Sequence, residues 1–162
     1  TVEYKETLTA FLGLTNVQSV KPELTDLAAE DPSGALWLDN PDRCCEIRKI
    51  WPLARVLDGF DAWITGRKSF QTHDRHHADR VEIQEDRLVI SPLLSWSNDD
   101  LRAYMQEHNL PRHPLERAGF PSVGCFTCTS PVHGQKDYRS GRWQGRTKAE
   151  CGIHRSPAFG SA

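Results

Sequence analysis

Hydrophobic residues recur along the chain with helical spacing in two places near its start. In residues 4–12 apolar side chains fall three and four positions apart, which predicts a helix. Residues 47–57 repeat this spacing, and Pro52 within them predicts a kink or a split into two pieces. We expect Asp42 to cap the start of this helix and Gly59 to mark its end.

Shorter apolar runs further along the chain predict strands. Residues 61–66 read as one strand, and the runs 81–83 and 88–90 flank a polar turn, which predicts a β-hairpin. Residues 97–109 begin with the Ser-x-x-Asp of a capping box and predict the clearest helix. The residues expected on its buried face are Leu101, Tyr104, Met105 and His108.

The remaining segments carry weaker patterns. Residues 16–21 predict a short strand, and residues 23–30 predict a short helix after a proline. Residues 31–42 and 67–80 read as loops, as does most of the chain after Leu110, which is rich in Gly, Pro, Ser and Thr. Because strands alternate with helices, the pattern favours an α/β fold.

The composition suits one globular domain: 162 residues, of which 38% are hydrophobic and 26% charged. There is no apolar run long enough for a membrane span and no signal peptide at the start, so we expect a cytoplasmic protein without a membrane partner. The net charge of −2 is uneven, because residues 1–42 are acidic and Lys and Arg gather between residues 134 and 155. Such a basic stretch is a solvated surface, an anion site for phosphate or sulfate, or a nucleic-acid patch.

Four of the five cysteines form two pairs, Cys44–Cys45 and Cys125–Cys128. A C-x-x-C pair can hold zinc, an iron–sulfur cluster or a redox disulfide. The adjacent pair favours a [4Fe–4S] cluster over zinc, because side chains about 100° apart on a helix can reach separate irons. The alternative for Cys44 and Cys45 is two buried apolar thiols. The cations of Arg48 and Lys49 would offset the charge of bound thiolates, although Arg48 also suits an exposed helix face.

The fifth cysteine, Cys151, lies among basic residues. Lys148 and His154 are close in sequence, and positive neighbours raise the thiolate fraction of a cysteine. Gly152 leaves the backbone free to bring the sulfur close to a substrate. The sequence alone leaves two interpretations open, a reactive nucleophile and an incidental thiol.

Two further groups of polar residues invite a functional interpretation. Arg139 and Arg142 suit a forked grip on phosphate or sulfate oxygens. His73, His76 and His77 could suggest a metal site, but we interpret them as part of a solvated or anion-facing loop.

Six segments occur along the chain in this order: CCEIRKIWPL, WITGRKSFQ, SPLLSW, LPRHPLERAGFPSVGCFTCTSPV, GRW and KAECGIH. Together they closely resemble the assimilatory adenylyl-sulfate and phosphoadenylyl-sulfate reductases, over nearly the whole chain. The resemblance implies an α/β fold of the adenine nucleotide alpha-hydrolase (PP-loop) type. The first helix is similar to the one that follows the nucleotide-binding strand in that family, so we expect the N-terminal strands and phosphate loop to lie outside this sequence.

The resemblance also implies the chemistry. The family reduces a sulfonucleotide to sulfite and releases AMP or its 3′-phosphorylated form, in sulfate assimilation and cysteine biosynthesis. Cys151 matches the family nucleophile, which forms an S-sulfocysteine that thioredoxin or glutaredoxin cleaves. His154 is expected to tune Cys151.

The positions that match the ligands of the family's [4Fe–4S] cluster are Cys44, Cys45, Cys125 and Cys128, with one cluster per chain. Lys49 matches a lysine close to the cluster, which shapes the electrostatics of the site. Members that have both cysteine pairs mostly use adenylyl sulfate, so this substrate is favoured over phosphoadenylyl sulfate.

Four basic residues match positions that hold the substrate in the family. Arg67 and Lys68 precede Gln71 in a basic segment, and Arg139 and Arg142 fall on an R-x-G-R-W segment. The resemblance implies that they bind phosphate or sulfate oxygens.

We therefore expect one reductase domain in three parts. Residues 1–42 end the nucleotide-binding fold, 43–130 bind the cluster and face the substrate, and 131–162 form a mobile catalytic tail that carries Cys151 to substrate and then to thioredoxin. One alternative is a zinc- or cluster-binding module that grips nucleic acid, although the aromatic content beside the basic residues is low and the chain has no RNA- or DNA-binding motif. Another is a reductase that folds around its cluster without binding nucleotide. We expect no nucleic-acid partner, and a homo-oligomer stays open.

Overall fold

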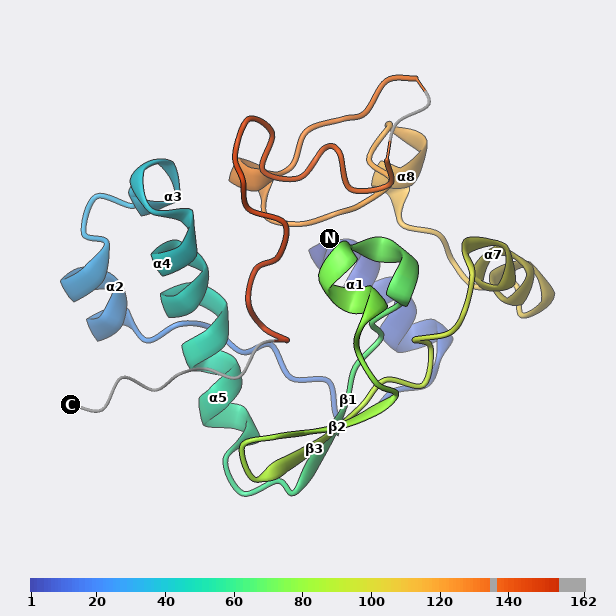
Figure 1. Ribbon diagram of the computed structural model, residues 1–162, viewed down its shortest axis with the longest axis horizontal. Helices are drawn as coiled ribbons and strands as arrows, with labels where there is room; N and C mark the ends of the chain where they lie inside the picture. The colour runs from blue at the N-terminus through green and yellow to red at the C-terminus, as the bar shows by residue number, and fades with distance from the viewer. Residues whose placement is uncertain (135–136, 155–162) are drawn as a thin grey trace. The chain divides into compact units, whose positions relative to one another are not determined.

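The computed structural model describes residues 1–134 and 137–154 (Figure 1). Contacts between residues divide the chain into two compact units, each assembled from segments that are distant in sequence. Unit 1 comprises residues 1–18, 66–78 and 92–147, and unit 2 comprises residues 19–65, 79–91 and the chain from 148 onward. The predicted tail lies partly outside the described residues, and the predicted three-part division stays a prediction.

Unit 2 contains a long, interrupted helix (Figure 1). It begins as α4 (Pro41–Cys45), passes through a π-helical turn (Glu46–Ile50) and continues as α5 (Trp51–Leu57). Pro52 explains the interruption, because it has no N–H and its ring clashes with the carbonyl four residues earlier, so the helix widens by one residue. The predicted kink is confirmed in this form.

The ends of this helix agree only in part with the sequence prediction. Asn40, not Asp42, caps the start, and its side chain accepts a hydrogen bond of 3.0 Å from the Arg43 N–H. The cap is one residue earlier than Pro41, which is favoured at the first helical position. The predicted end is confirmed, since Gly59 follows the helix with a φ of +81°.

A mixed three-stranded sheet completes unit 2. Its strands are β1 (Ala62–Ile64), β2 (Val81–Gln84) and β3 (Arg87–Ile90), in the order β1-β3-β2. β1 runs parallel to β3, and β2 runs antiparallel to it, so the predicted strand and hairpin are confirmed. Val89 in the central strand is fully buried, as is Ile47 in the π turn.

Two short helices precede the long helix in unit 2. α2 (Leu24–Glu30) confirms the helix predicted there. α3 (Leu36–Asp39) replaces part of a predicted loop. Asp31 between them is buried, and its carboxylate accepts from the Leu36 N–H at 3.0 Å and binds Arg48 at 2.7 Å. This ion pair connects the helical turn after Cys44 to the segment between α2 and α3.

Unit 1 consists of helices and loops. Its α-helices are α1 (Val2–Phe11), α6 (His73–His76), α7 (Asn98–Glu107) and α8 (Pro114–Arg117), and its 3₁₀ turns are Ser69–Gln71 and Phe126–Cys128. Leu94 and Trp143 are its most deeply buried apolar residues. The predicted helices α1 and α7 are therefore confirmed, and α6 replaces part of a predicted loop.

Helix α7 carries the predicted capping box, since Ser97 accepts from the Asp100 N–H while Asp100 accepts from the Ser97 N–H. Its predicted buried face is only half right: Leu101 and Met105 are partly buried, but Tyr104 and His108 are exposed and pack on each other with ring centroids 4.2 Å apart.

The strand predicted at residues 16–21 is wrong. These residues are exposed and irregular, and in the described sheet β1 and β2 each pair only with β3. A single extended run without a neighbour cannot satisfy its backbone groups as a strand. The α/β class is confirmed, and within the described residues no helix is both long and apolar enough to cross a membrane.

Candidate functional site

Each of the adjacent cysteines at the end of α4 has a cation one helical turn beyond it. Arg48 Nη1 lies 3.8 Å from the sulfur of Cys44, and Lys49 Nζ lies 3.7 Å from the sulfur of Cys45. Cys45 is buried with 4% of its surface exposed, whereas Cys44 is half-buried. The i, i+4 spacing thus places one positive group at each thiol.

The protonation of Cys45 depends on these neighbours. Burial raises the pKa of the Cys45 thiol, and the nearby sulfurs of Cys151 and Cys44 raise it further. The charges of Lys49 and Lys148 act in the opposite direction and lower this pKa. A buried thiolate here therefore requires positive charge beside it, from these lysines or from a bound metal.

The segment that carries Cys151 lies against the same helix. Lys148 is paired with Asp42 on the first turn of α4. Gly152 has a φ of +88°, and a Cβ atom placed on it would lie 2.8 Å from Cδ1 of Ile50 in the π turn. Only glycine fits this approach without strain. The half-buried Cys151 is thereby held in unit 2 beside the helix of Cys44 and Cys45.

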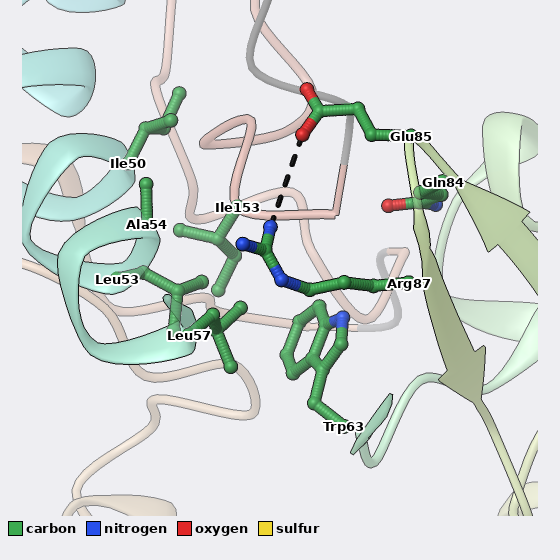
Figure 2. Close-up of a pocket in the computed structure, with 9 residues that line it drawn as sticks. All are labelled: Ile50, Leu53, Ala54, Leu57, Trp63, Gln84, Glu85, Arg87 and Ile153. Atoms are coloured by element: carbon green, nitrogen blue, oxygen red, sulfur yellow. Dashed lines mark ion pairs between the residues drawn. The ribbon is translucent and has the colours of Figure 1, made fainter. Parts of the chain in front are cut away.

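The two residues after Gly152 contact α5 and the sheet of unit 2. Ile153 lines a small pocket together with aliphatic residues of α5 and Trp63 (Figure 2). The ring of His154 stacks on Trp63 with centroids 5.8 Å apart, and its Nδ1 lies 3.4 Å from Oγ1 of Thr65. The His154 carbonyl accepts from the side-chain amide of Gln84 at 3.2 Å. These contacts fix His154 to the sheet, and the predicted tuning of Cys151 stays a prediction.

The C-x-x-C pair belongs to unit 1, where a 3₁₀ turn presents both thiols. The Cys125 carbonyl accepts from the Cys128 N–H at 3.0 Å and from the Thr129 hydroxyl at 2.8 Å. The Cys128 carbonyl accepts from the Trp143 N–H at 3.1 Å. Cys125 is exposed and Cys128 is half-buried. Hydrogen bonds to backbone carbonyls thus shape this loop, in which Cys125 is the more exposed of the two cysteines.

Arg142 packs against this loop and stabilises it. Its guanidinium donates to the Val123 carbonyl at 3.2 Å and lies 4.5 Å from the ring centre of Trp143. A Cβ atom on Gly124 would lie 2.2 Å from the guanidinium carbon, so the guanidinium could not keep this position beside a larger residue. Arg139 lies 5.8 Å from the same ring. The sequence analysis missed Trp143, whose signal was an aromatic residue beside two arginines.

The basic segment after β1 also belongs to unit 1. Arg67 is buried, and burial lowers the pKa of Lys68, with a smaller contribution from Arg75. Arg75 is itself buried and donates to the side-chain oxygen of Gln71. The sequence analysis missed Arg75, because it lies in a histidine-rich stretch that read as a solvated loop. Three cations gathered in one partly buried segment can attract an anion.

The histidines of this segment are exposed, and the rings of His73 and His77 lie 5.3 Å apart. Within each unit, the described residues contain no group of three His, Cys, Asp or Glu side chains that could hold a metal ion. The structure thus brings Cys44, Cys45, Lys49, Cys151 and His154 together in unit 2, and places the other predicted site residues in unit 1. These are Arg67, Lys68, Cys125, Cys128, Arg139 and Arg142.

Comparison with known proteins identifies relatives. Residues 1–131 match the family model described as phosphoadenosine phosphosulfate reductase domain. The chain is 47% identical over 156 residues to the adenosine 5′-phosphosulfate reductase of Mesorhizobium japonicum, covering 96% of this chain and 61% of that protein. It is 41% identical over 142 residues to adenosine 5′-phosphosulfate reductase 2 of Bacillus subtilis, covering 85% and 60%. The chain thus spans about 60% of the length of these relatives.

A solved structure is also similar. The phosphoadenylyl-sulfate reductase from Candida auris, in a phosphate complex, superimposes with a TM-score of 0.58 at 22% sequence identity. The match covers 81% of this chain and 64% of that one. At this identity the likeness concerns the fold, and it agrees with the α/β class predicted from the sequence.

Proposed function

The chain belongs to the phosphoadenosine phosphosulfate reductase domain family, and on this premise we propose that the protein reduces adenylyl sulfate to sulfite and AMP in sulfate assimilation for cysteine biosynthesis. The observation that carries the proposal is the position of Cys151, whose flanking residues fasten it beside a helix that bears two cations. Relatives named for adenosine 5′-phosphosulfate support this substrate over its 3′-phosphorylated form, which is the alternative.

Cys151 acts as the nucleophile. Its thiolate attacks the sulfur atom of adenylyl sulfate, an S–S bond forms, and the bond from sulfur to the bridging oxygen breaks. AMP leaves with the electron pair of that bond, and Cys151 becomes an S-sulfocysteine.

A dithiol protein, thioredoxin or glutaredoxin, completes the cycle. One of its thiolates attacks the sulfur of Cys151 and displaces sulfite, which leaves a mixed disulfide. Its second thiol then closes its own disulfide and returns Cys151 to the thiol form, so that two electrons pass from the dithiol to the sulfonate sulfur. Because five cysteines, an odd number, suit a reducing compartment in which thiols stay free or metal-bound, we place this cycle in the cytoplasm.

The oxygen atoms of the substrate bind to the basic residues of unit 1. Arg67 and Lys68 are partly or fully buried, and an anion beside Lys68 would offset the lowering of its pKa by burial and by Arg75. Arg139 and Arg142 contribute further positive charge, although Arg142 also contacts the Val123 carbonyl and the Trp143 ring.

We also propose that Cys44, Cys45, Cys125 and Cys128 hold one [4Fe–4S] cluster. The chemistry of the donors fits, because all four are thiols, and the cations at Cys44 and Cys45 favour the thiolate forms. When bound, the cluster supplies a fixed charge that tunes the electrostatics around the cysteine helix without carrying the substrate's electrons. Lys49 and Lys148 are groups of this chain whose positive charges act on Cys45.

The intact mass of the protein after anaerobic incubation with adenylyl sulfate, without reductant, tests the proposal. We expect the addition of one SO₃ group, release of one AMP per adduct, and loss of both in Cys151→Ser. Parallel incubation with phosphoadenylyl sulfate compares the two substrates. A protein that retains its iron but gains no mass with either nucleotide would contradict the proposal and favour a cluster-binding module.

A further inference from the structure

A small pocket in unit 2 is lined in part by Ile153, which lies two residues after Cys151. One wall carries aliphatic side chains of the π turn and α5, including Ile50 and Leu53, and the other wall carries Trp63 and the hairpin. Figure 2 shows Ile153 beside the aliphatic side chains, with the guanidinium of Arg87 next to it and near the Trp63 ring. Arg87 forms an ion pair of 3.9 Å with Glu85. An aliphatic side chain between aliphatic and aromatic walls buries apolar surface, which favours the docked segment.

Polar and aromatic contacts hold the residues on either side of Ile153. Before it, Gly152 approaches Ile50 so closely that a methyl group would not fit. After it, His154 stacks on Trp63 and its carbonyl accepts from Gln84. Packing, stacking and hydrogen bonding therefore act on three consecutive residues, which is more than an incidental surface contact provides.

A second attachment lies on the other side of Cys151. Lys148, which is three residues earlier, pairs with Asp42 and keeps only 8% of its side chain exposed. Three extended residues span at most about 10 Å, so the sulfur of Cys151 has little freedom while both attachments hold. Cys151 therefore lies in a short strap that is fixed at both ends.

We propose that this pocket, which we call the anchor pocket, sets the working position of Cys151, and that Trp63, Gln84 and Ile153 are positioning residues for it. The inference rests on the proposed function, because it assigns these residues to that reaction. The docked strap holds Cys151 for attack on the sulfonucleotide. A reductant protein must reach the same sulfur, so release of Ile153 from the anchor pocket precedes the second half of the cycle.

The anchor pocket should therefore affect the two halves of the cycle in opposite directions. Ile153→Ala removes most of the apolar side chain in the pocket but leaves the folded body of unit 2 unchanged. We expect alkylation of Cys151 by iodoacetamide to become about tenfold faster, and S-sulfocysteine formation in a single turnover to become about tenfold slower. Release of sulfite by a dithiol protein should not slow.

The experiment uses the intact protein with its iron bound and follows the Cys151 peptide by mass. Trp63→Ala should change both rates as Ile153→Ala does. Trp63→Phe keeps an aromatic wall, so its rates should be close to those of the unchanged protein. Ile83→Ala is the matched control, since Ile83 lies in the same hairpin with 76% of its surface exposed and outside the pocket lining. Its alkylation and adduct rates should equal those of the unchanged protein.

The outcomes separate this inference from the proposed function. Faster alkylation in Ile153→Ala supports the anchor even where the unchanged protein forms no adduct with adenylyl sulfate, a result that would overturn only the reductase proposal. Unchanged alkylation and adduct formation in a folded Ile153→Ala protein would overturn the anchor and leave the reductase proposal standing. An equal slowing of both half-reactions would also overturn it, because a general loss of structure has that effect.

Discussion

Replacing Gly152 with alanine places a methyl group where the structure has no room for one. The backbone at this position has a φ of +88°, which disfavours any residue with a Cβ by about 1 kcal/mol. The new methyl would also lie 2.8 Å from Cδ1 of Ile50, and such overpacking costs about another 1 kcal/mol. Both penalties apply only to the docked strap, because a released strap adopts ordinary backbone angles.

The sum of about 2 kcal/mol corresponds to an approximately 30-fold shift from docked to released strap. Gly152→Ala should therefore expose Cys151 to alkylation and accelerate amide hydrogen exchange in residues 148–154, with both measured by mass spectrometry. The rate of S-sulfocysteine formation should fall in the same variant. Circular dichroism should report an unchanged fold, because the penalty lies in the strap.

Two further variants separate the backbone penalty from the collision. Ile50→Val deletes the Cδ1 atom that the new methyl would contact. Combined with Gly152→Ala it should therefore recover about half of the docking free energy lost in the single variant, which is a coupling free energy of about 1 kcal/mol between the two positions. Gly145→Ala is the control, since Gly145 has a φ of +75° but no atom within 4 Å of the added methyl, and it should leave Cys151 unaffected. Normal protection of Cys151 in Gly152→Ala, or no recovery with Ile50→Val, would refute the reasoning.

Four other substitutions test the fold and the cysteine loop. Hydrogen bonds from the Ser97 backbone and side chain lower the pKa of Asp100, so the stabilising effect of its carboxylate is present above about pH 3.8 and is lost as the pH falls through the lower folded-state pKa. Asp100→Asn should therefore make the melting temperature depend less on pH in the acid range. A dependence equal to that of the unchanged protein would contradict the assignment. Gly141→Ala should destabilise the protein by about 3 kcal/mol, because the added methyl would meet a backbone carbonyl at 2.3 Å. Gly124→Ala should cost about 1 kcal/mol, because its methyl meets a side chain that can move. If both variants melt at the same temperature as the unchanged protein, neither contact is tight. Arg142→Lys removes the guanidinium stacked on an aromatic ring and should destabilise the C-x-x-C loop by about 1 kcal/mol. The variant should then lose iron to a chelator faster than the unchanged protein, and an equal rate of iron loss would contradict this role of Arg142.

Local patterns in the sequence predicted most of the regular elements. The capping box at Ser97 and the proline inside the long helix act within a few residues, so the sequence alone reveals them. The strand expected at residues 16–21 failed because a strand needs a neighbour, which no local pattern supplies. The cap at Asn40 was missed because Asp42 is an equally good capping residue, and the position of Pro41 decides between them.

The candidate site was predictable in its residues but not in their surroundings. The cysteines were identified by spacing and by resemblance, and the paired cations at Arg48 and Lys49 follow from helical spacing. The contact of His154 with Trp63 joins residues that are far apart in the sequence, and the contact of Arg142 with its neighbour Trp143 depends on side-chain orientations that sequence spacing does not specify. Burial of Arg75 likewise depends on tertiary packing that a polar stretch does not announce.

The π turn at Glu46–Ile50 preserves the phase between two functional faces of one helix. A π turn contains one residue more than the α-helical turn that it replaces, and each residue rotates an α-helix by about 100°. Because the π turn and the α turn both complete about one rotation, the extra residue is taken up within the turn, and the aliphatic face of α5 keeps the direction relative to Cys44 and Cys45 that an uninterrupted helix would give it. The wider turn therefore admits Pro52 into the helix while the thiol end and the aliphatic end keep their angular relation.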